Sequence, residues 1–124
     1  MTTATPITAL AVLTDMDELT ETATTYAAMA DELASMVECS PQAHTIAGRI
    51  VIHRLAALHV ELDDLTVTTP THRHLVRLFN EVDELRLFLL DQDGPIFDAL
   101  ARPLDELYGA LVREARAAMT EGRA

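Results

Sequence analysis

Four side chains in the middle of the sequence are of types that could together bind a metal ion. His59 and Asp63 are four residues apart and would share one face of a helix, and His72 and His74 follow after a short connection. Imidazole nitrogens and carboxylates are ligands that Zn²⁺ and Fe²⁺ accept in proteins. The spacing matches no tight metal signature, and the Glu-x-x-His pairs of di-iron bundles do not occur in the sequence. We therefore expect surface histidines at a helix junction, with no metal or other cofactor.

Another histidine, His53, follows Arg49 by four residues, so the two would lie on one helix face. A general base needs a nucleophile or a positioned water beside it, and the sequence identifies no partner nucleophile. We interpret His53 as a residue at the boundary between the buried and the solvated face of a helix.

Two pairs of acidic residues have a spacing that Mg²⁺-dependent enzymes use. Glu18 and Glu21 are three residues apart, and so are Glu61 and Asp64. The pairs are similar to the Glu-x-x-Glu and Glu-x-x-Asp pairs with which all-helical nucleotide pyrophosphohydrolases hold Mg²⁺ against a nucleoside triphosphate. The match covers four acids at outward or marginal helix positions and assigns no family. Because outward acids are common on amphipathic helices, we expect a solvated face here.

Three arginines could form an anion site at one end of the molecule. Arg73 lies in the stretch TTPTHRH, at an expected helix N-terminus, and Arg113 and Arg116 should reach the same end. A helix N-terminus with basic side chains can bind phosphate or a carboxylate. The favoured alternative is that these arginines neutralise acids expected at the same end, which are Asp15, Asp17, Glu61, Asp63 and Asp64.

The composition indicates one all-α domain. The chain has 124 residues, of which 49% are apolar and 4% aromatic, and it contains four glycines. Aliphatic and small side chains suit helix packing on helix, whereas an all-β fold needs more glycines for its tight turns. A chain of this length buries a core without disulfides or metals, so we expect residues 1–124 to form a single domain.

The charge balance limits the classes of partner. Twenty acids against nine arginines and no lysine give a net charge of −11, which argues against nucleic acid or an anionic membrane and favours a basic protein surface. Arginine in place of lysine is typical of a high-GC bacterial genome. The single cysteine, Cys39, indicates a reducing compartment. The apolar run at 7–13 follows no basic residue and is too short for a signal peptide or a membrane span, so we expect a cytoplasmic protein.

Proline positions predict four helices. Proline follows Ser40, Thr69 and Gly94, and a cap-type residue or glycine before proline is a helix start signal. With a further start at Thr14, the expected helices are 14–38, 41–65, 70–91 and 95–119, preceded by an N-terminal extension at 1–13. Their short connections predict a four-helix up-down bundle. Pro103 should kink the fourth helix or split it, because proline lacks an N–H and clashes with the preceding turn.

Each expected helix carries a seam of apolar residues at alternating spacings of three and four, which predicts the core. The seams are Met16, Leu19, Ala23, Tyr26, Ala30, Leu33 and Val37; Ala47, Val51, Leu55, Leu58, Leu62 and Leu65; Leu75, Leu78, Val82, Leu85 and Leu89; and Phe97, Leu100, Leu104, Leu107, Leu111, Ala115 and Ala118. The tripeptide Asp-Glu-Leu occurs four times, with its leucine on a seam each time. The two acids before it lie about 100° and 200° round the helix axis, so we interpret the repeat as a solvated face behind a core leucine rather than as an active site.

Two helices have more apolar residues than a seam requires. The second adds Ile46, Ile50, Ala57 and Val60 and should be the most buried, and the third adds Phe79, Leu87, Phe88 and Leu90. A bundle core encloses one broad face of a helix. We therefore expect Leu87, Phe88 and Leu90 to contact a partner or a second copy. The alternative is that residues 7–13 fold back over them.

These features favour a small acidic interaction protein, an adaptor, regulator or inhibitor, that binds a partner protein. The sequence contains no Gly-rich phosphate loop, cysteine pair or catalytic constellation, so we lean against an enzyme. The expected partner is another protein or a second copy, with a homodimer as one expected form. The alternative function is a helical-bundle enzyme or metal protein, built on the histidine group or on the carboxylate set, for example a Mg²⁺-dependent activity like that of nucleotide pyrophosphohydrolases.

Overall fold

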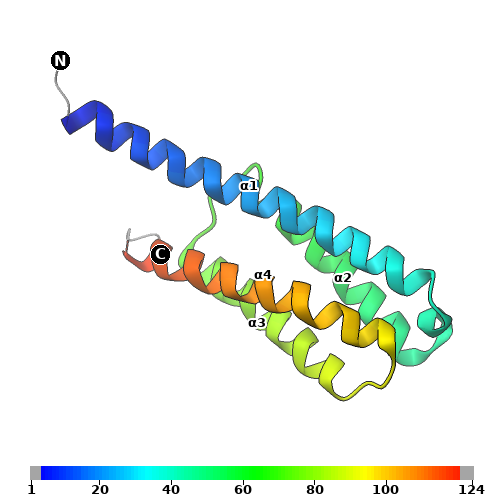
Figure 1. Cartoon of the computed structure of the whole chain (residues 1–124). Coiled ribbons are helices and arrows are strands. Elements are labelled where there is room, and N and C mark those ends of the chain that lie inside the picture. Colours follow the sequence, from blue (N-terminus) through cyan, green and yellow to red (C-terminus); the bar gives the residue numbers. More distant parts are fainter. Residues whose placement is uncertain (1–3, 121–124) are drawn as a thin grey trace.

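The computed structural model describes the backbone of residues 4–120 and the side chains of residues 20–120. Its four helices, α1 (Ala4–Glu38), α2 (Ile46–Asp64), α3 (His72–Leu90) and α4 (Pro95–Thr120), pack as the predicted all-α up-down bundle (Figure 1). A 3-10 turn, η1 (Pro41–His44), joins α1 to α2. Within residues 4–120 there is no β-strand.

The bundle is built as two helical hairpins. α1 packs mainly against α2 and α3 mainly against α4, while the contacts of α2 with α3 and of α1 with α4 are fewer. Short connections produce this arrangement, because they make consecutive helices antiparallel neighbours. The two hairpins therefore meet at two interfaces with few contacts, which we call the α2–α3 seam and the α1–α4 seam.

The core follows the predicted apolar seams. Every seam residue of α3 and α4 is buried, and Leu55, Leu75 and Leu104 are completely shielded from solvent. Tyr26 and Ala47 are the half-buried members, and both pack against the core. Burial of each leucine stabilises the fold by about 1.5–3 kcal/mol, so these seams dominate stability.

The Asp-Glu-Leu repeat has the predicted role at three of its four copies. Leu33, Leu85 and Leu107 are buried, and the acids before them are exposed or half-buried. The side chains of Leu19 and Met16 lie outside the described residues. In these three copies the repeat is a consequence of amphipathic helices, although Asp83 and Asp105 share Arg86 as an ion-pair partner.

Two of the three predicted proline starts are displaced toward a threonine. Ser40 and the proline after it begin η1, whereas Thr45 caps α2, its hydroxyl accepting a hydrogen bond of 3.0 Å from an N–H of the first turn. Thr71 caps α3 in the same way at 3.1 Å, and Pro70 stays outside the helix as a buried loop residue. Helix α2 begins at Ile46 rather than at 41, and α3 begins at His72, close to the expected 70. Proline fits a loop as well as a first helical turn, so the threonine cap defines each start.

The fourth helix begins at Pro95 as predicted. Gly94 before it has a φ of +139°, which residues with a Cβ rarely adopt. Pro103 lies inside α4, and the helix continues past it as one piece rather than two. Because proline has no N–H, the carbonyl of Ala99 loses its usual helical donor at this point.

The first helix begins at Ala4 rather than at Thr14. With 35 residues it is much longer than α2 or α3, and its N-terminal part extends past the end of the other helices (Figure 1). The backbone of residues 7–13 thus continues α1, at the opposite end of the bundle from the C-terminal end of α3. The predicted alternative, in which residues 7–13 fold back over α3, is therefore wrong; their side chains lie outside the described residues.

The second helix is not buried all round. Ile46 is 81% exposed and Val60 58% exposed, because α2 makes most of its contacts with α1 and fewer with α3. The prediction that α2 is the most buried helix was wrong for this reason. No helix in the described part of the chain combines the length and the apolar character that crossing a bilayer requires.

Candidate functional site

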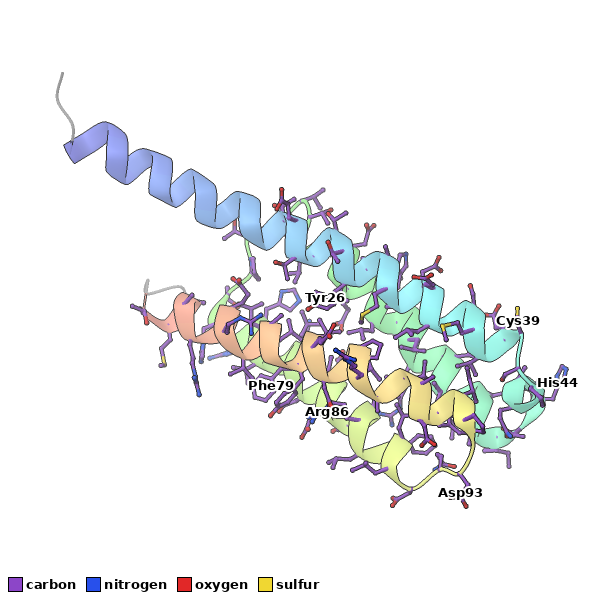
Figure 2. All side chains as sticks on the ribbon, in the orientation of Figure 1. Tyr26, Cys39, His44, Phe79, Arg86 and Asp93 are labelled. Carbon is purple, nitrogen blue, oxygen red and sulfur yellow. The ribbon has the colours of Figure 1, made fainter. Side chains whose placement is uncertain are left out.

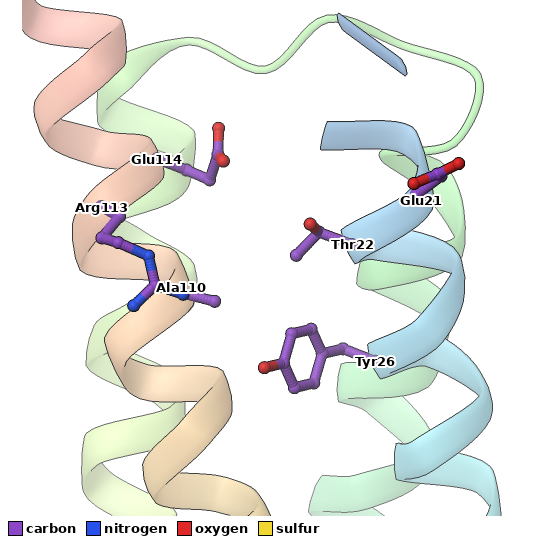
Figure 3. A pocket seen from close by; sticks show the side chains of 6 residues that line it. All are labelled: Glu21, Thr22, Tyr26, Ala110, Arg113 and Glu114. Carbon is purple, nitrogen blue, oxygen red and sulfur yellow. The ribbon is translucent and has the colours of Figure 1, made fainter. Parts of the chain in front are cut away.

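A cavity of about 280 Å³ opens between α1 and α4, where the two hairpins make few contacts. Thr22 and Tyr26 project from α1 toward α4, and Arg113 and Glu114 line the opposite wall (Figure 3). The hydroxyls and the guanidinium are hydrogen-bond donors for a small polar group, but acids flank them on both helices. The lining is therefore mixed in charge, without a dominant cationic or anionic character.

A second hollow, of about 530 Å³, lies where α1, η1 and α2 meet. Its polar lining consists of Glu38, His44, Arg49 and His53, around the apolar side chain of Ile52 and two alanines. The predicted pair of Arg49 and His53 on one helix face is thus present, and His44 joins it. None of the lining side chains carries a hydroxyl or a thiol, so the hollow supplies bases without a nucleophile.

Two of the three histidines of the predicted metal group bind backbone carbonyls inside their own hairpins. His59 Nδ1 lies 2.7 Å from the carbonyl oxygen of Ala27 on α1, and His72 Nδ1 lies 2.8 Å from that of Ala115 on α4. Each imidazole acts as donor in such a bond, since a carbonyl oxygen only accepts. The two rings therefore hold α2 to α1 and α3 to α4.

This placement does not bring the predicted metal group together. His59 and His72 are directed at different hairpin partners, Asp63 is exposed, and His74 is half-buried at the start of α3. Among the residues with described side chains, no three histidines, cysteines or acids are placed to hold a metal ion.

The predicted carboxylate set is also distributed over different surfaces. Glu21 lines the α1–α4 cavity, whereas Glu61 faces α3, where its Oε1 lies 3.4 Å from Nη2 of Arg77. Asp64 is exposed, and the side chain of Glu18 lies outside the described residues. Among the described side chains of this set, Glu21 and Glu61 thus face different helices rather than one another.

The three arginines of the predicted anion site differ in their surroundings. Arg73 and Arg116 are exposed, and Arg113 lies along the wall of the α1–α4 cavity. The predicted neutralisation of Glu61 comes from Arg77 instead. Arg77 lies further along α3 than Arg73, opposite Glu61 in the antiparallel pairing of α2 and α3. The prediction considered only arginines expected at the end of the bundle and therefore did not include Arg77.

An aromatic cluster between α3 and α4 was not predicted. The rings of Phe79 and Tyr108 meet edge to face with centroids 5.6 Å apart, and the guanidinium of Arg86 lies over the Tyr108 ring. Arg86 also forms ion pairs with Asp83 at 2.9 Å and Asp105 at 2.6 Å. Figure 2 marks Phe79 and Arg86 on α3. Phe79, counted as surplus in the sequence, is thus packed against α4.

Two of the three remaining surplus residues of α3 are exposed. Leu87 is 56% exposed and Leu90 is 76% exposed, one helical turn apart, while Phe88 is half-buried and packs against the core. Two large aliphatic side chains exposed on one helical turn form an apolar patch. Monomeric proteins rarely leave such patches open to solvent unless the patch contacts another molecule.

No protein-family model, curated protein or solved structure matches this chain.

Proposed function

We propose that this protein acts by binding another protein through the C-terminal end of α3, as an adaptor, regulator or inhibitor without catalytic activity of its own. The observation that supports the proposal is the exposure of Leu87 and Leu90, at 56% and 76%. They are three residues apart and therefore neighbours on the helix surface. Exposed apolar side chains grouped in this way are typical of contact sites for other proteins.

The charges around these leucines indicate the chemistry of the partner. Glu84 and Asp91 lie one turn before and one turn after Leu87, and both are exposed. Of the arginines nearby, Arg86 is occupied by Asp83 and Asp105, and Arg54 of α2 lies 3.7 Å from Glu84. The surface thus has an apolar centre and an acidic rim on a chain of net charge −11. A partner with an apolar contact and basic residues around it fits this surface.

The test compares two double variants that add the same charge at exposed apolar positions. Leu87→Glu with Leu90→Glu changes the proposed surface, and Ile46→Glu with Val60→Glu changes α2 instead. A partner is identified by crosslinking in the source cells, purified, and titrated against each variant by calorimetry. We expect the α3 variant to bind about tenfold or more weakly, a loss of about 1.4 kcal/mol, and the α2 variant to bind like the wild type.

Ionic strength and self-association complete the test. The wild-type affinity should fall as salt is added, since acidic and basic rims attract each other less when screened. Equal binding by both double variants, or an affinity indifferent to salt, would contradict the proposal. Sedimentation equilibrium of the protein alone tests the alternative occupant: a mass that rises with concentration in wild type and not in the α3 variant would assign the surface to a second copy.

A further inference from the structure

The seam between α2 and α3 is lined by charged side chains from both helices. Arg54 of α2 lies 3.7 Å from Glu84 of α3, and Glu61 of α2 lies 3.4 Å from Arg77 of α3. Glu81 is one turn from Arg77 and from Glu84, and its carboxyl group reaches the carboxyl group of Glu61 within hydrogen-bonding distance. Two acids thus meet at the seam between the two ion pairs.

One carboxylate oxygen of Glu61 lacks a hydrogen-bond donor. Its Oε1 accepts from Arg77, but its Oε2 is buried and has no hydrogen-bond partner unless a neighbouring carboxyl group supplies a proton. A buried carboxylate oxygen without a donor is unfavourable. Glu81 can act as donor only in its protonated form, because an ionised carboxylate accepts and does not donate.

The surroundings of Glu81 favour that protonated form. The hydrogen bond to Glu61 is the largest cause, followed by burial and by the charge of Glu61, and together they raise the pKa of Glu81 from 4.5 to about 7. The negative charge of Glu84 acts in the same direction, and the positive charge of Arg77 opposes it. Because Glu81 as a residue remains exposed, we regard the hydrogen bond as more important than burial.

We propose that Glu61 and Glu81 share one proton across the α2–α3 seam, and that loss of this proton weakens the hold of one hairpin on the other. With the proton present, the pair carries a single negative charge and the buried oxygen of Glu61 has its donor. Without it, two carboxylates face each other beside Glu84, and the buried oxygen has none. The seam is sensitive to this change because the contacts between the hairpins are fewer than those within them.

The direction of the pH effect follows from proton linkage. The folded chain binds the proton of Glu81 more tightly than the unfolded chain does, so the stabilisation is complete below the ordinary glutamate pKa and is lost as the pH rises through about 7. Every other ionisable group of the chain also contributes to the pH dependence of unfolding, so the absolute slope of stability against pH is not diagnostic. The difference between wild type and a variant of Glu81 isolates the pair.

The decisive variant is Glu81→Gln, whose side-chain amide can donate to Glu61 at every pH. Denaturant unfolding is measured for both proteins from mildly acidic to mildly alkaline pH. We expect the unfolding equilibrium constant of wild type to rise relative to that of the variant by about tenfold across the window, less than the full pKa difference implies because Glu81 is partly screened by solvent. The matched control Glu106→Gln, at an exposed acid of α4, should keep the wild-type pH dependence.

A direct titration completes the experiment. Carbon NMR of the glutamate carboxyl groups should place the Glu81 midpoint near 7 in wild type and at a clearly lower pH in Glu61→Gln. If Glu81→Gln failed to fold, this second measurement would still decide. A Glu81 midpoint in the ordinary carboxyl range, or a Glu81→Gln protein with the same pH dependence as wild type, would overturn the proposal.

Discussion

The guanidinium carbon of Arg86 on α3 lies 4.3 Å from the centre of the Tyr108 ring on α4. The guanidinium nitrogens of Arg86 also lie 2.6 Å from Asp105 and 2.9 Å from Asp83. The Arg86 side chain is only 29% exposed. Stacking on an aromatic face and pairing with carboxylates use different parts of a planar guanidinium, so the two interactions support each other. Arg86 therefore joins the helices of the second hairpin more firmly than a surface ion pair would.

Arg86→Ala should lower the free energy of unfolding by about 1–3 kcal/mol, through loss of the stacking and of hydrogen bonds to carboxylates. Arg86→Lys should recover only part of this, because an ammonium group lacks the planar fork. Arg102→Ala is the matched control: it removes a 3.7 Å ion pair to Glu106 from a side chain that is 90% exposed, and it should change stability by less than about half a kcal/mol. Urea unfolding measures all three, and equal losses for Arg86→Ala and Arg102→Ala would contradict the assignment.

Core packing should matter more than the repeated acids. Leu58 is 3% exposed, and Leu58→Ala should cost about 2–5 kcal/mol because a cavity remains in the core. Asp31→Ala and Glu32→Ala, at exposed positions of α1, should each stay within about half a kcal/mol. Chemical denaturation compares them, and acid variants as damaging as the leucine variant would mean that the Asp-Glu-Leu repeat has a structural role that we have not assigned.

Two glycines should respond to alanine with opposite signs. A Cβ on Gly48, in the first turn of α2, would overlap the backbone carbonyl of Gln42 in η1. Gly48→Ala should therefore destabilise the protein by about 1–3 kcal/mol, as overpacking does. A Cβ on Gly109 would make only an ordinary contact, 3.7 Å from Arg113, so Gly109→Ala should stabilise α4 by about 0.5–1 kcal/mol. Thermal unfolding decides, and destabilisation by both variants would be the contrary result.

Zinc should bring no specific gain in thermal stability. A ligand stabilises a protein only when it binds the folded state preferentially, and His59 and His72 each bind a carbonyl of a different helix. The measurement is the unfolding temperature of dialysed protein with and without added Zn²⁺. A gain that disappears in the double variant His72→Ala with His74→Ala would restore the metal hypothesis.

Much of the fold could be predicted from the sequence, because its main signals act within single helices. Apolar spacing placed Leu55, Leu75 and Leu104 in the core, and all three are fully buried. Helix boundaries were less predictable at Thr45 and Thr71, where adjacent cap-type residues compete and the backbone geometry selects one.

The candidate sites were harder to predict, because they depend on which faces of different helices meet. His59, Asp63, His72 and His74 do lie on α2 and α3 as expected, but the imidazoles of His59 and His72 each bond a carbonyl of their own hairpin partner. Arg86 and Asp105 are 19 residues apart in the chain, and no spacing rule connects them with Tyr108.

By itself the sequence determined four amphipathic helices, their apolar seams and the acidic character of the surface, since helical periodicity and charge are properties of neighbouring residues. Only the tertiary structure decided that the helices pair as two hairpins, that Ile46, Leu87 and Leu90 remain exposed, and that the carboxyl group of Glu81 meets that of Glu61. The physical reason is that a row of apolar residues specifies which face of a helix is buried. It does not specify which neighbouring helix packs against the flanks of that face. Burial, ion pairing and proton sharing at the flanks depend on that choice.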